Sequence, residues 1–236
     1  MQIKLSKKPK NCTFIEGFPG FGLVGTIATE FLLDHLKTEQ IGKITFDEMP
    51  AMVAIHEGNV IEPLGVFYNK KHNLAFLHVV TSSTGMEWKL ADIVTEISKQ
   101  LNVKEILSIE GVGSSTGKTD SRVFYYSNND KSKKKFEAMG IKPLKEGIII
   151  GVTGAVLLRV EKTTVSCVFA ETQSKLPDSK AAAKVIEVLD EYLGLKVDTK
   201  PLIEQAEKFE GKLKGLLNQG QKAQELSEKK KLSYVG

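Results

Sequence analysis

Hydrophobic and polar positions alternate with two different periods along residues 1–197. Apolar residues three and four positions apart predict helices, at residues 21–36, 83–101, 132–140 and 177–194. Between the helices, short runs rich in β-branched and aromatic residues predict strands, at residues 11–17, 41–47, 51–58, 60–69, 72–80, 104–111, 121–126 and 163–171. Residues 151–162 fit either a helix or a buried strand.

The order of these elements indicates the fold class. Strands that alternate with helices predict a layered α/β fold around a mixed sheet. The two runs on either side of residues 69–73 are predicted to form an antiparallel hairpin within it. We therefore assign residues 1–197 to one α/β core domain.

The pattern changes after Val197. Residues 198–236 carry no strand signal, and their apolar positions step by four, three, four and three: Leu202, Ala206, Phe209, Leu213 and Leu216. Such a narrow stripe predicts a C-terminal helical arm, followed by a flexible tail. The arm either packs on its own domain or lies at a subunit or partner interface.

Composition and charge exclude few classes of protein. The chain has 236 residues, of which 41% are hydrophobic and 26% charged, as in soluble globular proteins. A net charge of +4 is too small to indicate nucleic-acid binding, and the lysines at positions 131 and 133–135 are better explained as a solvated helix face. Cys12 and Cys167 lie in strand-like runs and are expected to be buried thiols. No secretory signal or membrane span is recognisable, so we expect a cytoplasmic location.

The stretch EGVGSSTGKTDSR, residues 110–122, resembles two catalytic motifs. A phosphate-binding loop needs glycine five positions before Gly117, where this chain has Val112, and a helix after it. The serine-hydrolase elbow matches with Ser115 as nucleophile, but all four histidines precede it and no helix follows. We predict a loop between strands and no catalytic residue; if the loop has a function, we expect it to shape a subunit or partner surface.

A second glycine motif has a better context. Gly20-Phe21-Gly22-Leu23-Val24-Gly25 fits the dinucleotide-binding fingerprint, because it follows a predicted strand and opens a predicted helix. Pro19 and Phe21 make this turn bulky, so a tight structural turn is favoured and cofactor binding through Gly20, Gly22 and Gly25 is the alternative. No metal site is predicted, because the histidine and cysteine spacings match none.

Three segments together resemble a known family. GFPGFGLVG (17–25), GVTGAVLL (151–158) and ETQSKLPDSKAAAKVIEVL (171–189) are similar to the archaeal and bacterial relatives of the second proteasome assembly chaperone, a family also labelled as an ATP-grasp or carboxylate–amine-ligase superfamily. The resemblance implies a three-layer mixed sheet similar to the phosphorylase/hydrolase-like fold. It also implies homo-oligomers that chaperone proteasome α subunits without ATP chemistry.

The C-terminus bears on the same expectation. In proteasome-binding members of this family the last residues often form a hydrophobic–tyrosine–any motif, which docks between α subunits. This chain ends in Leu232-Ser233-Tyr234-Val235-Gly236, so its tyrosine is one position off register. Leu232, Tyr234 and Val235 are the predicted partner-binding residues, and a frayed terminus is the alternative.

The leading hypothesis is a non-enzymatic, homo-oligomeric, chaperone-like protein whose partners are proteasome α subunits or assembled α rings. The rival hypothesis is an enzyme that binds a nucleotide or another cofactor at the turn formed by Gly20, Gly22 and Gly25.

Overall fold

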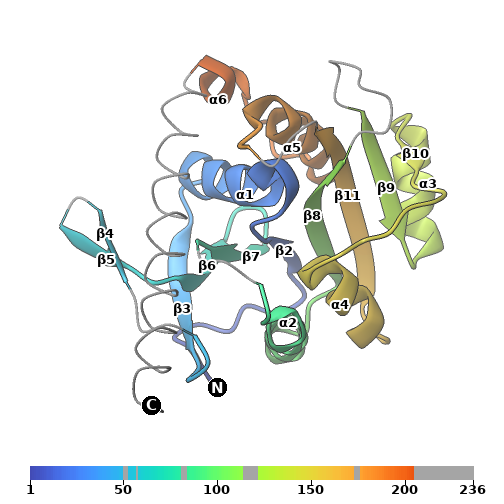
Figure 1. The fold of residues 1–236 in the computed structure, drawn as a ribbon. Helices are drawn as coiled ribbons and strands as arrows, with labels where there is room; N and C mark the ends of the chain where they lie inside the picture. The colour runs from blue at the N-terminus through green and yellow to red at the C-terminus, as the bar shows by residue number, and fades with distance from the viewer. Residues whose placement is uncertain (50–52, 57, 81–83, 114–121, 173–175, 205–236) are drawn as a thin grey trace, which may run out of the picture.

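A computed structural model describes residues 1–49, 53–56, 58–80, 84–113, 122–172 and 176–204. They form a mixed sheet of nine strands with helices on both faces, which confirms the predicted layered α/β fold (Figure 1). In spatial order the strands are β1 (Gln2–Leu5), β3 (Glu39–Thr45), β6 (Leu64–Asn69), β7 (Leu74–Val79), β2 (Thr13–Gly17), β8 (Glu105–Gly113), β11 (Thr164–Thr172), β9 (Val123–Ser127) and β10 (Lys142–Pro143).

The centre of the sheet is parallel. Strands β7, β2, β8 and β11 run in the same direction, so their carboxyl ends meet at one edge of the sheet. Outside them, β6 forms the predicted antiparallel hairpin with β7, and β9 pairs antiparallel with β11. Loops at the carboxyl edge of a parallel sheet are where α/β proteins place their sites.

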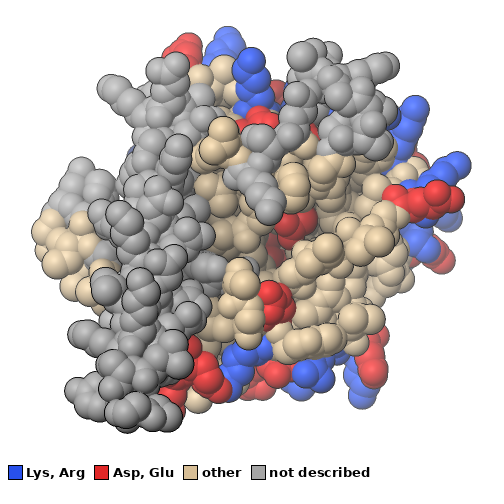
Figure 2. All heavy atoms as spheres, viewed as in Figure 1, with Lys and Arg blue, Asp and Glu red and all other residues tan. Residues whose placement is uncertain are grey.

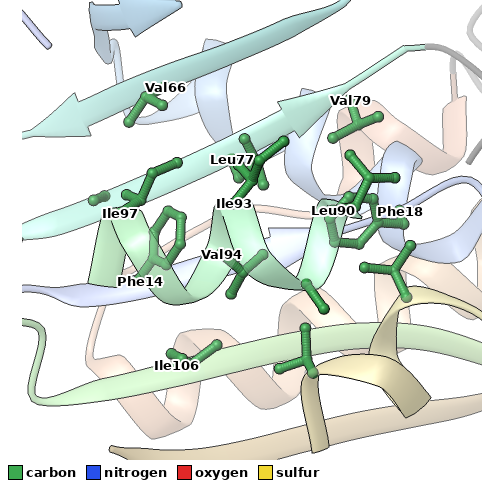
Figure 3. Close-up of a cluster of buried hydrophobic side chains, with 14 of the residues drawn as sticks. Phe14, Phe18, Val66, Leu77, Val79, Leu90, Ile93, Val94, Ile97 and Ile106 are labelled. Carbon is green, nitrogen blue, oxygen red and sulfur yellow. The ribbon is translucent and has the colours of Figure 1, made fainter. Parts of the chain in front are cut away.

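Helices cover the two faces of the sheet separately. On one face lie α2 (Glu87–Leu101) and α4 (Val152–Arg159), and on the other lie α1 (Val24–His35), α3 (Asp130–Ala138) and α5 (Ser179–Leu193). Figure 3 shows the core of the first face, where Ile93 and Ile97 of α2 pack toward Leu77 of β7. Burying apolar side chains in two such layers supplies most of the stabilisation of the fold.

Helix ends agree with the local sequence signals. The helix α5 begins after Asp178, whose side chain accepts a hydrogen bond from the backbone N–H of Ala181, and it ends at Gly194 with a φ of 68°. Asp at the N-cap and a left-handed glycine at the end are the signals that predicted this helix. The ambiguous segment at residues 151–162 forms the helix α4.

The prediction of one continuous strand over residues 60–69 is wrong. Pro63 interrupts it, because proline has no N–H to give to the ladder, and separate strands β5 (Asn59–Ile61) and β6 result. Among the described strands, β5 pairs with β4 (Ala54–His56) alone, and the two form a hairpin that projects from the body of the molecule (Figure 1). The edge strands β1 and β10 were not predicted, since lysines interrupt the apolar pattern of the first and the second has two residues.

The C-terminal arm is described only at its start. Helix α6 (Lys200–Glu204) buries Leu202, the first residue of the predicted stripe. The other stripe residues and the predicted docking residues Leu232, Tyr234 and Val235 lie outside the described residues. The domain boundary at Val197 therefore stays a prediction. Among the described helices, none has both the length and the apolar character to cross a membrane.

Candidate functional site

The glycine turn, residues 17–25, joins β2 to α1 at the carboxyl edge of the sheet. It passes through the 3₁₀ turn η1 (Phe21–Leu23), in which Gly22 has a φ of 63° and Leu23 a φ of 50°. A Cβ on Gly25 would lie 2.5 Å from the carbonyl oxygen of Ile109 in β8. Glycine at this position therefore lets the first turn of α1 lie directly on the sheet.

Atoms of the chain also fill the space beside the other two glycines of the fingerprint. A Cβ on Gly20 would overlap Oε1 of Glu110, and one on Gly22 would lie 2.8 Å from Oγ1 of Thr172. A dinucleotide site needs such glycines so that a pyrophosphate can approach the backbone. In this protein, the side chains of Glu110 and Thr172 occupy the space in which a pyrophosphate would approach the backbone, and Glu110 carries a carboxyl group. This packing favours the interpretation of a structural turn.

Glu110, in the second half of β8, lies in a small buried polar network. Oγ1 of Thr153 donates a hydrogen bond of 2.8 Å to Oε2 of Glu110, and the hydroxyls of Ser108 and Thr153 are 3.0 Å apart. Burial raises the pKa of Glu110 to about 7, against a lowering effect of the hydrogen bond from Thr153. The network joins the sheet to the first turn of α4.

Glu16, on β2, is the second buried acid of this edge. It stands beside Ser108 in the parallel register and is wholly buried. Neither of its carboxyl oxygens has a hydrogen-bond partner among the described residues. Burial raises its pKa to about 8; the Ser108 hydroxyl lowers this pKa and the nearby Glu110 raises it. Near pH 7 Glu16 is thus largely neutral and Glu110 is about half protonated, which reduces the penalty for burying charge here.

These contacts bring together the three segments that resemble the chaperone family, residues 17–25, 151–158 and 171–189. The first contributes Gly20, which lies against Glu110, and the second contributes Thr153, which binds it. In the third, Oγ1 of Thr172 donates to Asp178 at 2.8 Å, and the N–H of Asp178 donates to the carbonyl of Gly22 at 2.9 Å. Sequence reasoning missed Glu16 and Glu110. The signal was present, because each is a carboxyl on the inward side of an apolar strand.

The stretch 110–122 connects two strands, as predicted. Strand β8 runs to Gly113 and β9 begins at Val123, while Ser115 lies outside the described residues. Arg122, just before β9, donates two hydrogen bonds to the carboxylate of Glu171, at 2.6 and 2.8 Å. In the described parts of the chain, no group of three or more His, Cys, Asp and Glu side chains could hold a metal ion.

Other predicted features have structural roles. The lysines of residues 131–135 lie on α3, where Lys133 pairs with Asp130 and Lys135 lies over the ring of Tyr192. Cys12 and Cys167 are buried free thiols, as expected. Burial raises the pKa of the Cys12 thiol to about 11.

The described surface has one large apolar area, which we call the apolar surface: Trp88, Ile148, Ile150 and Leu158. These side chains are 52%, 88%, 82% and 74% exposed. A groove of about 480 Å³ is lined by Trp88, Ile150 and Leu158. A second groove of about 770 Å³, which Ile148 lines, shares Ile149 with it. In Figure 2 the area over α4 and the segment leading into it is mostly uncharged, with acidic and basic side chains around it.

The fold and the site define a layered α/β protein with a closely packed glycine turn and a large exposed apolar area, and exposed apolar areas of this kind are typical of protein-interaction sites. The chain belongs to the PAC2 family, whose sequence profile matches residues 14–217.

Individual relatives cover almost the whole chain. An uncharacterized protein of Methanocaldococcus jannaschii, MJ0106, is 27% identical over 228 residues, which are 96% of this chain and 94% of that protein. The crystal structure of Pyrococcus furiosus PbaA, an archaeal homolog of proteasome-assembly chaperone, is 31% identical with a TM-score of 0.83, and the match covers 94% of this chain and 100% of PbaA. P. furiosus PbaB, an archaeal proteasome activator, shares the fold at 20% identity and a TM-score of 0.73, over 91% of this chain and 98% of PbaB.

Proposed function

We propose that this protein is a non-enzymatic, homo-oligomeric, cytoplasmic chaperone-like protein that binds proteasome α subunits or assembled α rings. The observation that carries the proposal is the likeness to PbaA, an archaeal homolog of proteasome-assembly chaperone, over 94% of this chain. The apolar surface supports it, because exposed apolar areas of this kind mark sites where proteins meet.

The C-terminal tail is the proposed contact with the α subunits. It presents Leu232, Tyr234 and Val235 after a charged spacer, at the end of the predicted helical arm. A flexible tail is ordered on binding and so binds weakly by itself, but an oligomer presents several tails at once and gains affinity through avidity.

A pull-down of purified α subunits tests both parts. The full chain, a chain that ends before Leu232, Tyr234→Ala and the matched control Ser233→Ala are compared as bait. Retention by the full chain and Ser233→Ala, with strong loss in the other two, is expected. No retention by any variant would overturn the partner, whereas equal retention by all four would overturn only the role of the tail.

The rival function, an enzyme that binds a nucleotide or another cofactor, is disfavoured by the packing of the glycine turn. Glu110 lies against Gly20, and an ionised carboxylate there would repel a phosphate. Calorimetric titration with ATP and NAD discriminates between the two functions. Micromolar binding that is lost in Gly22→Val but kept in Gly113→Ala would establish the rival function. Such binding would also support the ligase label of the family.

A further inference from the structure

The helix α4 and the segment before it are more apolar than the described chain can bury. Val152, Ala155 and Val156 pack into the core, but Leu158 points outward from the same helix. In the extended residues 147–150, Ile149 packs inward while Ile148 and Ile150 are exposed. A helix that is apolar on all sides is normally covered on all sides, so this sequence pattern indicates a protein partner over the apolar surface.

The apolar surface is held in a fixed shape. The guanidinium of Arg159 lies over the ring of Trp88, 5.1 Å from its centroid, and forms an ion pair with Asp92 at 3.2 Å. The Trp88 ring, which forms one side of the 480 Å³ groove, is therefore oriented before any partner arrives. Aromatic and arginine side chains that are oriented in advance are typical anchors of protein interfaces.

The chain also carries an apolar projection. The β4–β5 hairpin has Ile55 directly opposite Val60, and these two side chains and Val53 are 72%, 58% and 58% exposed. Within the described residues the hairpin pairs with no strand of the main sheet. A two-stranded hairpin of this length is marginally stable in water, so it too requires a surface to pack on.

We propose that the β4–β5 hairpin of one copy packs into the groove of the apolar surface on a second copy. The projecting element and the groove are alike in chemistry, because the exposed apolar side chains Ile55 and Val60 would meet the exposed apolar side chains Ile150 and Leu158, with Glu87 on the wall of the groove. Figure 1 places the hairpin beside β3 and β6, and α4 beside β8 and β11, so the two surfaces are separate. Such a contact joins two different surfaces; where it is not returned within the same pair it is head-to-tail, and its repetition closes a ring or extends a chain.

This inference rests on the self-association in the proposed function, but not on the proteasome partner. Two double variants of the full chain test it by light scattering after gel filtration. Ile55→Glu/Val60→Glu disables the hairpin and keeps the groove, while Ile150→Glu/Leu158→Glu disables the groove and keeps the hairpin. All four side chains are exposed, so circular dichroism should show folded proteins. Tyr126→Glu, an exposed position on β9, is the control.

The head-to-tail contact predicts a specific result on mixing. The unaltered chain and Tyr126→Glu form oligomers, and each double variant alone is a monomer. An equimolar mixture of the two double variants forms 1:1 dimers, because one intact hairpin and one intact groove remain.

Three results would overturn the inference. If either double variant keeps the full oligomer, or if the mixture stays monomeric, the head-to-tail contact is wrong while self-association stands. A monomeric unaltered chain would contradict both the contact and the proposed self-association. Retention of α subunits, measured separately, reports on the proteasome partner alone.

Discussion

Oγ1 of Thr153, in the first turn of α4, donates a hydrogen bond of 2.8 Å to Oε2 of Glu110, in the second half of β8. This bond ties the helix that carries part of the apolar surface to the edge of the sheet beside the glycine turn. Glu16 stands one strand away, on β2, and its carboxyl oxygens have no partner among the described residues. Two acids with raised pKa values thus lie under α4, and their protonation should influence stability.

Stability should fall as the pH rises. The carboxyls of Glu16 and Glu110 have an ordinary pKa of 4.5, and folding raises these values to about 8 and about 7. The folded state therefore binds more protons than the unfolded state, so the contribution of both groups is full below pH 4.5 and is lost as the pH rises through 7 and 8. Urea unfolding between about pH 5.5 and about pH 9 should show a loss of several kcal/mol in the free energy of unfolding, at about 1.4 kcal/mol per pKa unit. The same slope in Glu16→Gln as in the unaltered chain would contradict this origin.

Two buried glutamates of the sheet should respond oppositely to substitution. Glu105, at the start of β8, accepts hydrogen bonds from the hydroxyls of Ser132, Ser166 and Tyr192 at 2.6 to 3.1 Å. Glu105→Gln should destabilise the fold by about 1–3 kcal/mol. Only the oxygen of the glutamine amide can accept hydrogen bonds, so these hydroxyls would lose one of their two acceptor atoms. Glu16→Gln should stabilise it at alkaline pH, because it removes a buried ionisable group whose pKa is raised by burial and whose carboxyl oxygens have no hydrogen-bond partner among the described residues. Denaturant midpoints at about pH 9 check both signs, and destabilisation by Glu16→Gln would show that its carboxylate is stabilised.

The glycine turn should not tolerate a methyl group at Gly25. Alanine is better than glycine in a helix by about 1 kcal/mol, yet the new Cβ would lie 2.5 Å from the Ile109 carbonyl. We expect Gly25→Ala to destabilise the protein by about 1–3 kcal/mol. Gly113→Ala is the matched control, because its Cβ would only touch a ring carbon of Phe21 at 3.9 Å. Thermal unfolding measures both, and equal midpoints would show that α1 can move away from the sheet.

The single tryptophan of the chain should report the assembly. Trp88 is half exposed and lines the groove that we assign to the hairpin of a second copy. Its emission should therefore shift to shorter wavelengths as the concentration rises and the oligomer forms, since the indole leaves water. Ile55→Glu/Val60→Glu should keep the long-wavelength emission at every concentration. A constant emission maximum across the range in which the mass changes would place the interface elsewhere.

Local signals predicted most of the elements. Helix α5 could be read from Asp178 and Gly194, because a cap and a left-handed end act within a few residues. Strands β2, β8 and β11 could be read from their apolar β-branched runs. Strand β1 could not, because what makes Gln2–Leu5 a strand is its pairing with β3, more than thirty residues away.

The roles of the glycine motif depended on packing. The spacing of Gly20, Gly22 and Gly25 is that of a cofactor turn, and only the side chains brought there from β8 and β11 distinguish a packed turn from a phosphate site. The same holds for Glu16 and Glu110. Each is one acid in an apolar run, and the parallel register alone makes them neighbours.

The sequence by itself determined the fold class, most of the helices and strands and the resemblance to a chaperone family, because these depend on periodicity and on motifs that are local in the chain. Tertiary structure alone decided three other points: that the three segments that resemble the family meet beside the glycine turn, that burial raises the pKa values of Glu16 and Glu110, and that Trp88, Ile148, Ile150 and Leu158 form one exposed apolar surface. The physical reason is that burial, and with it both the pKa of an acid and the exposure of an apolar side chain, is set by residues far away in the chain.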